Sequence, residues 1–138
     1  MKALVVESLS TMRAVLRRIL SMRGFEVAEA DNCQEAMSVL HAMGTADLVL
    51  VDWSPRELDS LEFISHLRLE PEHETVVIML VAAAPGIHEL QKALLAGADD
   101  YLMKPFTTLQ IDEKLYKLGL LGHPAGGVIE DVLLADRV

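Results

Sequence analysis

The sequence predicts an α/β fold, a doubly wound parallel sheet of five strands with helices on both faces. Short apolar runs rich in Val, Leu and Ile recur along the chain, and such runs are typical of strands that are buried on both faces. Between these runs, apolar residues recur at intervals of three and four, the spacing of one face of a helix. Strict alternation of strand and helix favours parallel strands joined by right-handed crossovers.

The five strands are expected where the apolar runs lie. The runs "ALVV", "DLVLVD", "VVIMLVA" and "DYLM" are nearly continuous, whereas "FEVAEA" alternates and suits an edge strand. The predicted strand ranges are 2–7, 25–30, 47–52, 76–82 and 99–103.

Helices are expected between the strands, near residues 10–23, 33–43, 60–69, 87–96 and 107–118. Gly24 and Gly97 lie where two of them should stop, and a glycine supplies a left-handed cap without steric cost. Three pairs have the spacing of capping boxes at helix starts, namely Asn32 with Glu35, Asp59 with Glu62, and Thr107 with Gln110.

Length and charge exclude several classes of protein. The chain has 138 residues, enough for one domain, and lacks an apolar stretch of the roughly 20 residues that span a bilayer. Its N-terminus meets Glu7 too early for a secretory signal, so we expect a cytoplasmic protein without a membrane anchor. The formal charge of -9 repels nucleic acid and anionic lipid, which argues against direct binding of either.

Cysteine and histidine content argues against a structural metal site. Cys33 is the lone cysteine, so an internal disulfide is impossible and inert packing near a helix start is expected. The histidines are scattered, with no pair at metal-ligand spacing beside a third ligand. We therefore expect surface residues at His41, His66, His73, His88 and His123.

Three predicted strand ends each carry a charged side chain, Glu7, Asp52 or Lys104. The carboxyl ends of parallel strands share one edge of the sheet, where ligands bind in doubly wound folds. Two carboxylates can hold Mg²⁺, and an ammonium can neutralise phosphoryl oxygens, so the trio has the parts for phosphate acceptance on Asp52. A simple ion pair of Lys104 with either acid is the alternative.

The segments "LVVESLSTMR", "LVLVDWS" and "LLAGADDYLMKPFTTLQIDEKL" resemble the receiver domains of bacterial two-component response regulators, above all the single-domain chemotaxis regulators. The resemblance covers about residues 2–118 and implies a flavodoxin-like strand order 2-1-3-4-5. It implies a signalling protein and not an enzyme, in which a sensor histidine kinase phosphorylates Asp52 and Lys104 contacts the phosphoryl group.

The resemblance also assigns roles outside the acidic pocket. Tyr101 matches the aromatic residue that swings inward on activation. An ordinary half-buried aromatic residue on a strand, without a switching role, is an equally good interpretation of Tyr101. A face with Leu90, Tyr101 and Lys114 would meet a downstream protein. Lys104–Pro105 would be a cis peptide. Residues 1–118 would form the receiver and residues 119–138 a tail that is flexible or docks on a partner, with a homodimer possible.

Departures from the family pattern fall on the pocket itself. The family's second acid, a direct metal ligand, is Ser8 here, which could instead cap a helix start. The family's Thr or Ser at the fourth strand end is Ala82, which has no hydroxyl to grip a phosphoryl group. The loop after Asp52 differs as well, because Ser60 stands where the family usually has a glycine. Metal coordination by the Ser54 carbonyl is therefore less secure than the other expected contacts. Mg²⁺, held by Glu7, Asp52 and that carbonyl, should bind weakly if at all.

There are three alternatives to a phosphorylated receiver. The chain could be a pseudo-receiver, an interaction or dimerisation module that works without phosphorylation. A flavodoxin shares the alternation, and Ser8, Ser10 and Thr11 could cradle a flavin phosphate, but no glycine lets the backbone approach it. A phosphatase with Asp52 as nucleophile would want a second carboxylate where Ser54 stands.

Overall fold

The computed structural model describes residues 1–53, 57–83 and 86–122. The chain divides into two compact units, Met1–Lys104 and Pro105–Val138. In the described residues, the first unit holds the sheet and four α-helices, and the second holds helix α5, Thr108–Lys117.

The sheet has five parallel strands in the order β2-β1-β3-β4-β5. This confirms the predicted doubly wound α/β fold and its strand order. The register sets Asp52 beside Val81 and Ala83 beside Lys104. The strands are β1 Lys2–Val6, β2 Glu26–Ala30, β3 Leu48–Asp52, β4 Val77–Ala83 and β5 Asp100–Lys104.

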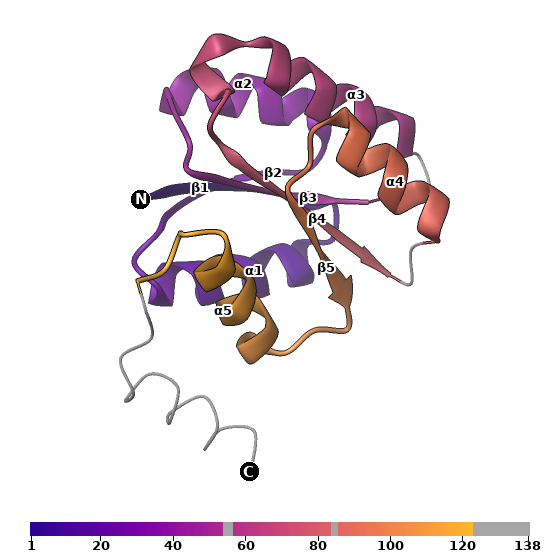
Figure 1. Ribbon diagram of the computed structural model, residues 1–138. Helices are drawn as coiled ribbons and strands as arrows, with labels where there is room; N and C mark the ends of the chain where they lie inside the picture. Colours follow the sequence, from indigo (N-terminus) through magenta and orange to yellow (C-terminus); the bar gives the residue numbers. More distant parts are fainter. Residues whose placement is uncertain (54–56, 84–85, 123–138) are drawn as a thin grey trace. The chain divides into compact units, whose positions relative to one another are not determined.

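Within the first unit, helices cover both faces of the sheet (Figure 1). Helix α1 lies on one face, and α2, α3 and α4 lie on the other. None of the helices in the described part of the chain is long and apolar enough to cross a membrane. The bounds are α1 Ser10–Met22, α2 Cys33–Met43, α3 Glu57–Leu69, the short 3-10 helix η1 Pro71–His73, and α4 Ile87–Ala96.

The core explains why the central strands are continuously apolar. Alternate residues of β3, such as Val49 and Val51, belong to a buried cluster that includes Leu40 of α2 and Ile64 of α3. The intervening residues of β3 are equally buried. A strand covered by helices on both faces has no solvated side, so a polar residue on it emerges only at an end. Asp52 is that residue in β3.

Two of the three predicted helix caps are confirmed. The Asn32 side chain accepts a hydrogen bond from the Glu35 amide, and Thr107 with Gln110 forms a complete capping box. The prediction for Asp59 is wrong, because α3 already begins at Glu57 and Asp59 lies in its first turn. Negative charge is favourable in the first turn of a helix, so Asp59 stabilises the start of α3 from within the helix and does not cap it.

Candidate functional site

The structure brings the three predicted strand-end residues together at the carboxyl edge of the sheet. The Lys104 Nζ donates to Asp52 Oδ1 at 2.7 Å and to Glu7 Oε1 at 3.0 Å. Lys104 is the last residue of β5, Asp52 is the last of β3, and Glu7 directly follows β1. We call Glu7, Asp52 and Lys104 the strand-end site.

Burial differs sharply within the strand-end site. The Glu7 side chain is 1% exposed, whereas those of Asp52 and Lys104 are 16% and 18% exposed. The Glu7 Oε2 is buried and has no hydrogen-bond partner within the described residues. A buried carboxylate oxygen without a partner is costly, so this atom is suited to a cation or a proton.

The charges at this site shift two pKa values. Burial raises the pKa of Glu7, the adjacent Asp52 carboxyl raises it further, and Lys104 offsets only part of this rise. Burial by itself lowers the pKa of Lys104, but hydrogen bonds with Asp52 and Glu7 outweigh it, and the pKa is raised overall. Lys104 therefore keeps its positive charge between the two acids, and Glu7 binds a proton more readily than an ordinary glutamate.

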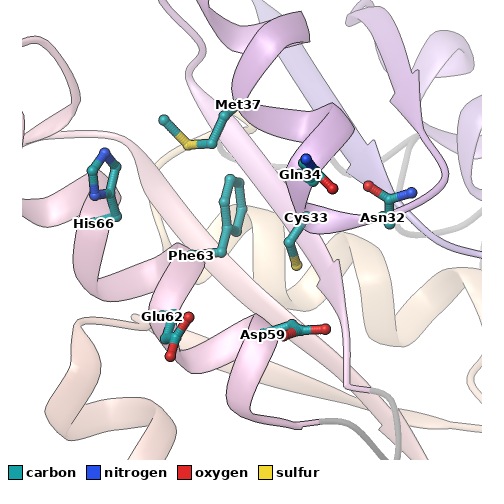
Figure 2. Close-up of a pocket in the computed structure, with 8 residues that line it drawn as sticks. All are labelled: Asn32, Cys33, Gln34, Met37, Asp59, Glu62, Phe63 and His66. Carbon is teal, nitrogen blue, oxygen red and sulfur yellow. The ribbon is translucent and has the colours of Figure 1, made fainter.

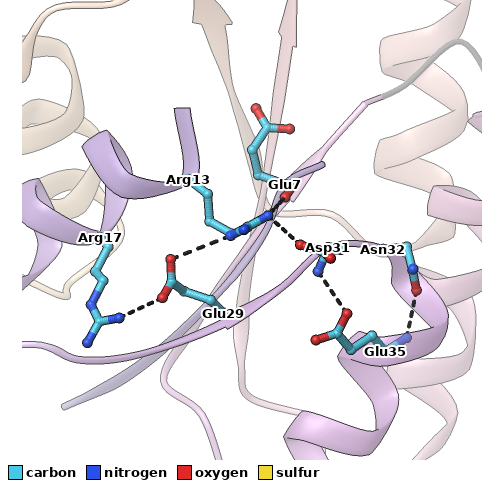
Figure 3. Close-up of polar contacts among 7 residues, drawn as sticks. All are labelled: Glu7, Arg13, Arg17, Glu29, Asp31, Asn32 and Glu35. Carbon is cyan, nitrogen blue, oxygen red and sulfur yellow. Dashed lines mark hydrogen bonds and ion pairs between the residues drawn. The ribbon is translucent and has the colours of Figure 1, made fainter. Parts of the chain in front are cut away.

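The main chain of Glu7 is held from two sides. Its amide donates to the Ala30 carbonyl at 3.0 Å, and its carbonyl accepts from Arg13 Nη1 at 2.7 Å. Arg13 also pairs with Asp31 and Glu29, so three acceptors fix the guanidinium (Figure 3). The arginine lies in the first turn of α1, six residues after Glu7, and the sequence analysis did not identify it.

The main chain of Asp52 is also anchored by a residue that the sequence analysis noted only as a departure. The Ser60 hydroxyl donates to the Asp52 carbonyl at 3.2 Å and is almost fully buried. The next amide along, that of Trp53, donates to the Val81 carbonyl at 2.8 Å. A glycine at position 60 would leave that carbonyl without this donor, so Ser60 gives this chain its own way of orienting Asp52.

Three further positions, at which the sequence departs from the family pattern, determine how strongly the site is expected to bind a metal ion. Ser8 is exposed, and helix α1 is capped at Leu9 with no side-chain hydrogen bond. The interpretation of Ser8 as a helix cap is therefore wrong. Ala82 is 1% exposed near the end of β4. Ser54, whose carbonyl was the third predicted metal ligand, lies outside the described residues.

The predicted partner-face residues come from both units and are described one at a time. Leu90 is half-buried on α4, and Lys114 is half-buried on α5. Tyr101 of β5 is half-buried and packs against the core cluster. Their shared role in partner binding stays a prediction, as does the cis form of the Lys104–Pro105 bond.

An open hollow lies between α2 and α3 (Figure 2). Cys33 and Asp59 line it at one end and His66 lines it at the other. Burial raises the pKa of the Cys33 thiol to about 11, with Ser60 as a weaker opposing influence. This agrees with the expected inert cysteine, because the thiolate is the reactive form.

Comparison with known proteins shows to which family the chain belongs. A sequence model of the response regulator receiver domain matches residues 3–116. The chain belongs to the response regulator receiver family. It is 34% identical to the chemotaxis protein CheY1 of Helicobacter pylori over 116 residues, which is 83% of this chain and 94% of that protein. A CheY homologue of Campylobacter jejuni is 35% identical over the same length, with 83% and 89% covered.

Solved structures agree with this assignment. A response regulator from Thermotoga maritima superposes with a TM-score of 0.75 at 28% identity, covering 85% of this chain and 95% of that one. Receiver domains are signalling modules that interact with histidine kinases and downstream targets, and they typically bind Mg²⁺ at an acidic pocket. The protein is thus a two-component receiver of the CheY type, and the flavodoxin alternative is set aside.

One expectation about the histidines is wrong. His73 is 1% exposed, so it is a core residue and not a surface residue. His41 and His66 are exposed, as expected. All three have their Nε2 atoms within 3.7 Å of a Glu70 carboxylate oxygen. Residue spacing does not reveal this grouping, because the three histidines come from different elements.

Proposed function

We propose that Asp52 accepts a phosphoryl group from a sensor histidine kinase and that the receiver passes the signal on by contact with another protein. The observation that carries this proposal is the Lys104 ammonium 2.7 Å from a carboxylate that remains 16% exposed. An Asp52 oxygen would attack phosphorus, so that the phosphohistidine P–N bond breaks as the P–O bond forms. Lys104 is placed to neutralise the phosphoryl oxygens during that exchange.

One atom of the strand-end site is especially suited to bind a divalent cation. Glu7 Oε2 is buried without a hydrogen-bond partner in the described part of the chain, and Mg²⁺ commonly takes one or two carboxylates together with waters. Glu7 and Asp52 would hold the ion, which when bound would neutralise charge on the transferred group. Since Ser8 adds no carboxylate, the affinity should be lower than with a paired acid.

The buried Ala82 limits the conformational response. A ligand shifts an equilibrium only through contacts that differ between the two states. Without a hydroxyl near the end of β4, one such contact to the phosphoryl group is missing. Phosphorylation should therefore change the receiver less than it would with Thr at this position.

The experiment exposes the protein to acetyl phosphate with Mg²⁺ and reads the intact mass. We expect a gain of one phosphoryl group that is lost in Asp52→Asn and kept in Asp59→Asn. Asp59 is the matched control, because it is an exposed aspartate in the first turn of α3. No gain in the wild-type protein, or the same gain in Asp52→Asn, would contradict the proposal.

A pseudo-receiver is the second candidate, favoured by Ser8 and by the buried Ala82. In that case the scaffold binds a partner, or a second copy of itself, without phosphate chemistry. Equal affinity for the partner before and after treatment with acetyl phosphate would favour this alternative. Leu90, Tyr101 and Lys114 are then the first residues to test by substitution, each by itself.

A further inference from the structure

A second polar cluster lies at the amino edge of the sheet, where the strands begin. Glu70 and η1 connect α3 to β4, and the Val77 amide that opens β4 donates to the Asp47 carbonyl just before β3. Asp52 lies at the other end of β3, one strand length away. Glu70, Glu72 and His73, here called the Glu70–His73 cluster, are therefore separate from the strand-end site.

His73 is the unusual member of this cluster. It is 1% exposed, and both ring nitrogens are buried without a hydrogen-bond partner in residues 1–53, 57–83 and 86–122. The Glu70 Oε2 is likewise buried and unpartnered. These atoms face each other, with His73 Nε2 3.3 Å from Glu70 Oε2. A ring nitrogen and a carboxylate oxygen buried side by side cost free energy unless a proton or a metal cation joins them.

The donor spacing matches a tetrahedral metal ion. Zinc–ligand bonds of about 2.0–2.2 Å at tetrahedral angles place two donor atoms about 3.3–3.5 Å apart. The Glu70–His73 separation of 3.3 Å falls in that range. One ligand atom from each of Glu70, Glu72 and His73 lies within 4.8 Å of the other two. Glu72 is exposed, which gives an ion a path from solvent.

Two further imidazoles surround the same carboxylate. The Nε2 atoms of His66 and His41 lie 3.5 Å and 3.7 Å from Glu70 Oε1. Both side chains are about 60% exposed, so they can rotate toward an ion held by the cluster. A mixed set of imidazole and carboxylate donors suits zinc-class ions, whereas Mg²⁺ prefers oxygen alone.

The segment that carries the cluster is held in place by hydrogen bonds. The Arg68 guanidinium donates to the His73 carbonyl at 3.2 Å and to the Val76 carbonyl at 2.7 Å. The His73 amide donates to the Glu70 carbonyl at 3.0 Å, which closes the turn through Pro71. The main chain that carries the ligands is therefore held in place before any ion arrives, which lowers the entropic cost of binding.

We propose that Glu70, Glu72 and His73 form a binding site for one divalent transition-metal ion of the zinc class. The ion would lie against η1 and would link it to α3 through His66 and to the end of α2 through His41. This site is independent of phosphorylation at Asp52.

The test is calorimetric titration of untagged protein with zinc chloride. With excess Mg²⁺ present to compete for the strand-end site, we expect one equivalent of zinc to bind to the wild-type protein. Glu72→Gln and His73→Gln should weaken binding at least about tenfold, because each removes a ligand. Glu74→Gln is the matched control, an exposed glutamate two residues beyond Glu72, and should bind zinc as the wild-type protein does.

Three controls separate this site from others. Asp52→Asn should leave zinc affinity unchanged, and excess Mg²⁺ should not displace the ion. X-ray absorption should show nitrogen and oxygen ligands without sulfur, which excludes Cys33. If His73→Gln does not fold, Glu72→Gln decides, because that side chain is on the surface. Absence of zinc binding, wild-type affinity in Glu72→Gln, or sulfur in the ligand shell would overturn the proposal.

Discussion

The two edges of the sheet are each organised by one cation, and the cations work differently. At the carboxyl edge, Lys104 bonds to the side chains of Glu7 and Asp52. At the amino edge, Arg68 donates mainly to main-chain carbonyls, those of His73, Glu74, Val76 and Gly97, and pairs with the Asp99 carboxylate.

The difference separates a structural role from a reactive one. Main-chain carbonyls have no chemistry to perform, so the rigid guanidinium fork of Arg68 fixes the path of the loop. Carboxylates can bind a metal or accept a phosphoryl group, and the ammonium of Lys104 is a mobile point charge that can follow them. Of the two cations, Lys104 is therefore the one whose partners can take part in phosphoryl transfer.

Arg68→Met should have the largest effect on stability. It removes donors from several carbonyls at once, and we expect a loss of about 3–5 kcal/mol in the free energy of unfolding. Urea denaturation measures the change, and Arg17→Met is the control because its side chain is 56% exposed. A loss no larger in Arg68→Met than in the control would show that these bonds do not hold the amino edge.

Lys104→Met should cost less, about 2–3 kcal/mol, because Asp52 is partly solvated and can relax, and the buried Glu7 can take up a proton. Lys92→Met, on an exposed position of α4, is the matched control. The distinctive expectation concerns function, since the same variant should also lose phosphorylation by acetyl phosphate. A stable Lys104→Met that is phosphorylated at the wild-type rate would remove the ammonium from the proposed chemistry.

Ser8→Asp should sharpen the carboxyl edge as a metal site. An added carboxylate beside Glu7 should tighten Mg²⁺ binding about tenfold, equivalent to about 1.4 kcal/mol. Fluorescence of Trp53, the residue after Asp52, reports the titration. Ser10→Asp adds the same charge at an exposed position of α1 and serves as the control. Equal affinities in the two variants would mean that position 8 does not face the ion.

Glu7→Gln should alter the pH dependence of stability, which is the smallest effect of the four. Because the pKa of Glu7 is raised in the folded state, its favourable contribution is present at low pH and is lost as pH rises through that pKa. The variant should therefore gain stability over the wild-type protein as pH rises from about 4.5, the ordinary value, toward neutrality. Denaturation in a pH series, without Mg²⁺, measures the difference. A constant difference across the series would contradict the inferred shift.

The strands and helices could be predicted almost completely from local sequence patterns, whereas the strand order came from the resemblance to receiver domains. The apolar run of β3 ends in Asp52, and helix α2 begins after an asparagine cap. The start of α3 was misplaced because Asp59 has the features of a cap and equally suits a first turn. Local patterns alone do not distinguish those two positions.

The charged residues of the candidate site could be predicted from the sequence, but the residues that hold its main chain in place could not. Glu7, Asp52 and Lys104 stand at strand ends, and parallel strands bring such ends together. Arg13 and Ser60 bond to main-chain carbonyls, and such a bond leaves no signal in the spacing of residues. His73 was misjudged for a similar reason, since its burial depends on how η1 packs and a lone histidine has no periodicity.

The half-buried thiol of Cys33 has a practical consequence for studies of self-association. With a pKa of about 11, it keeps its proton at neutral pH, and a protonated thiol attacks disulfides poorly. Any dimer of this receiver seen in aerated buffer should therefore be held by packing alone, and should separate into single chains on a denaturing gel run without reductant.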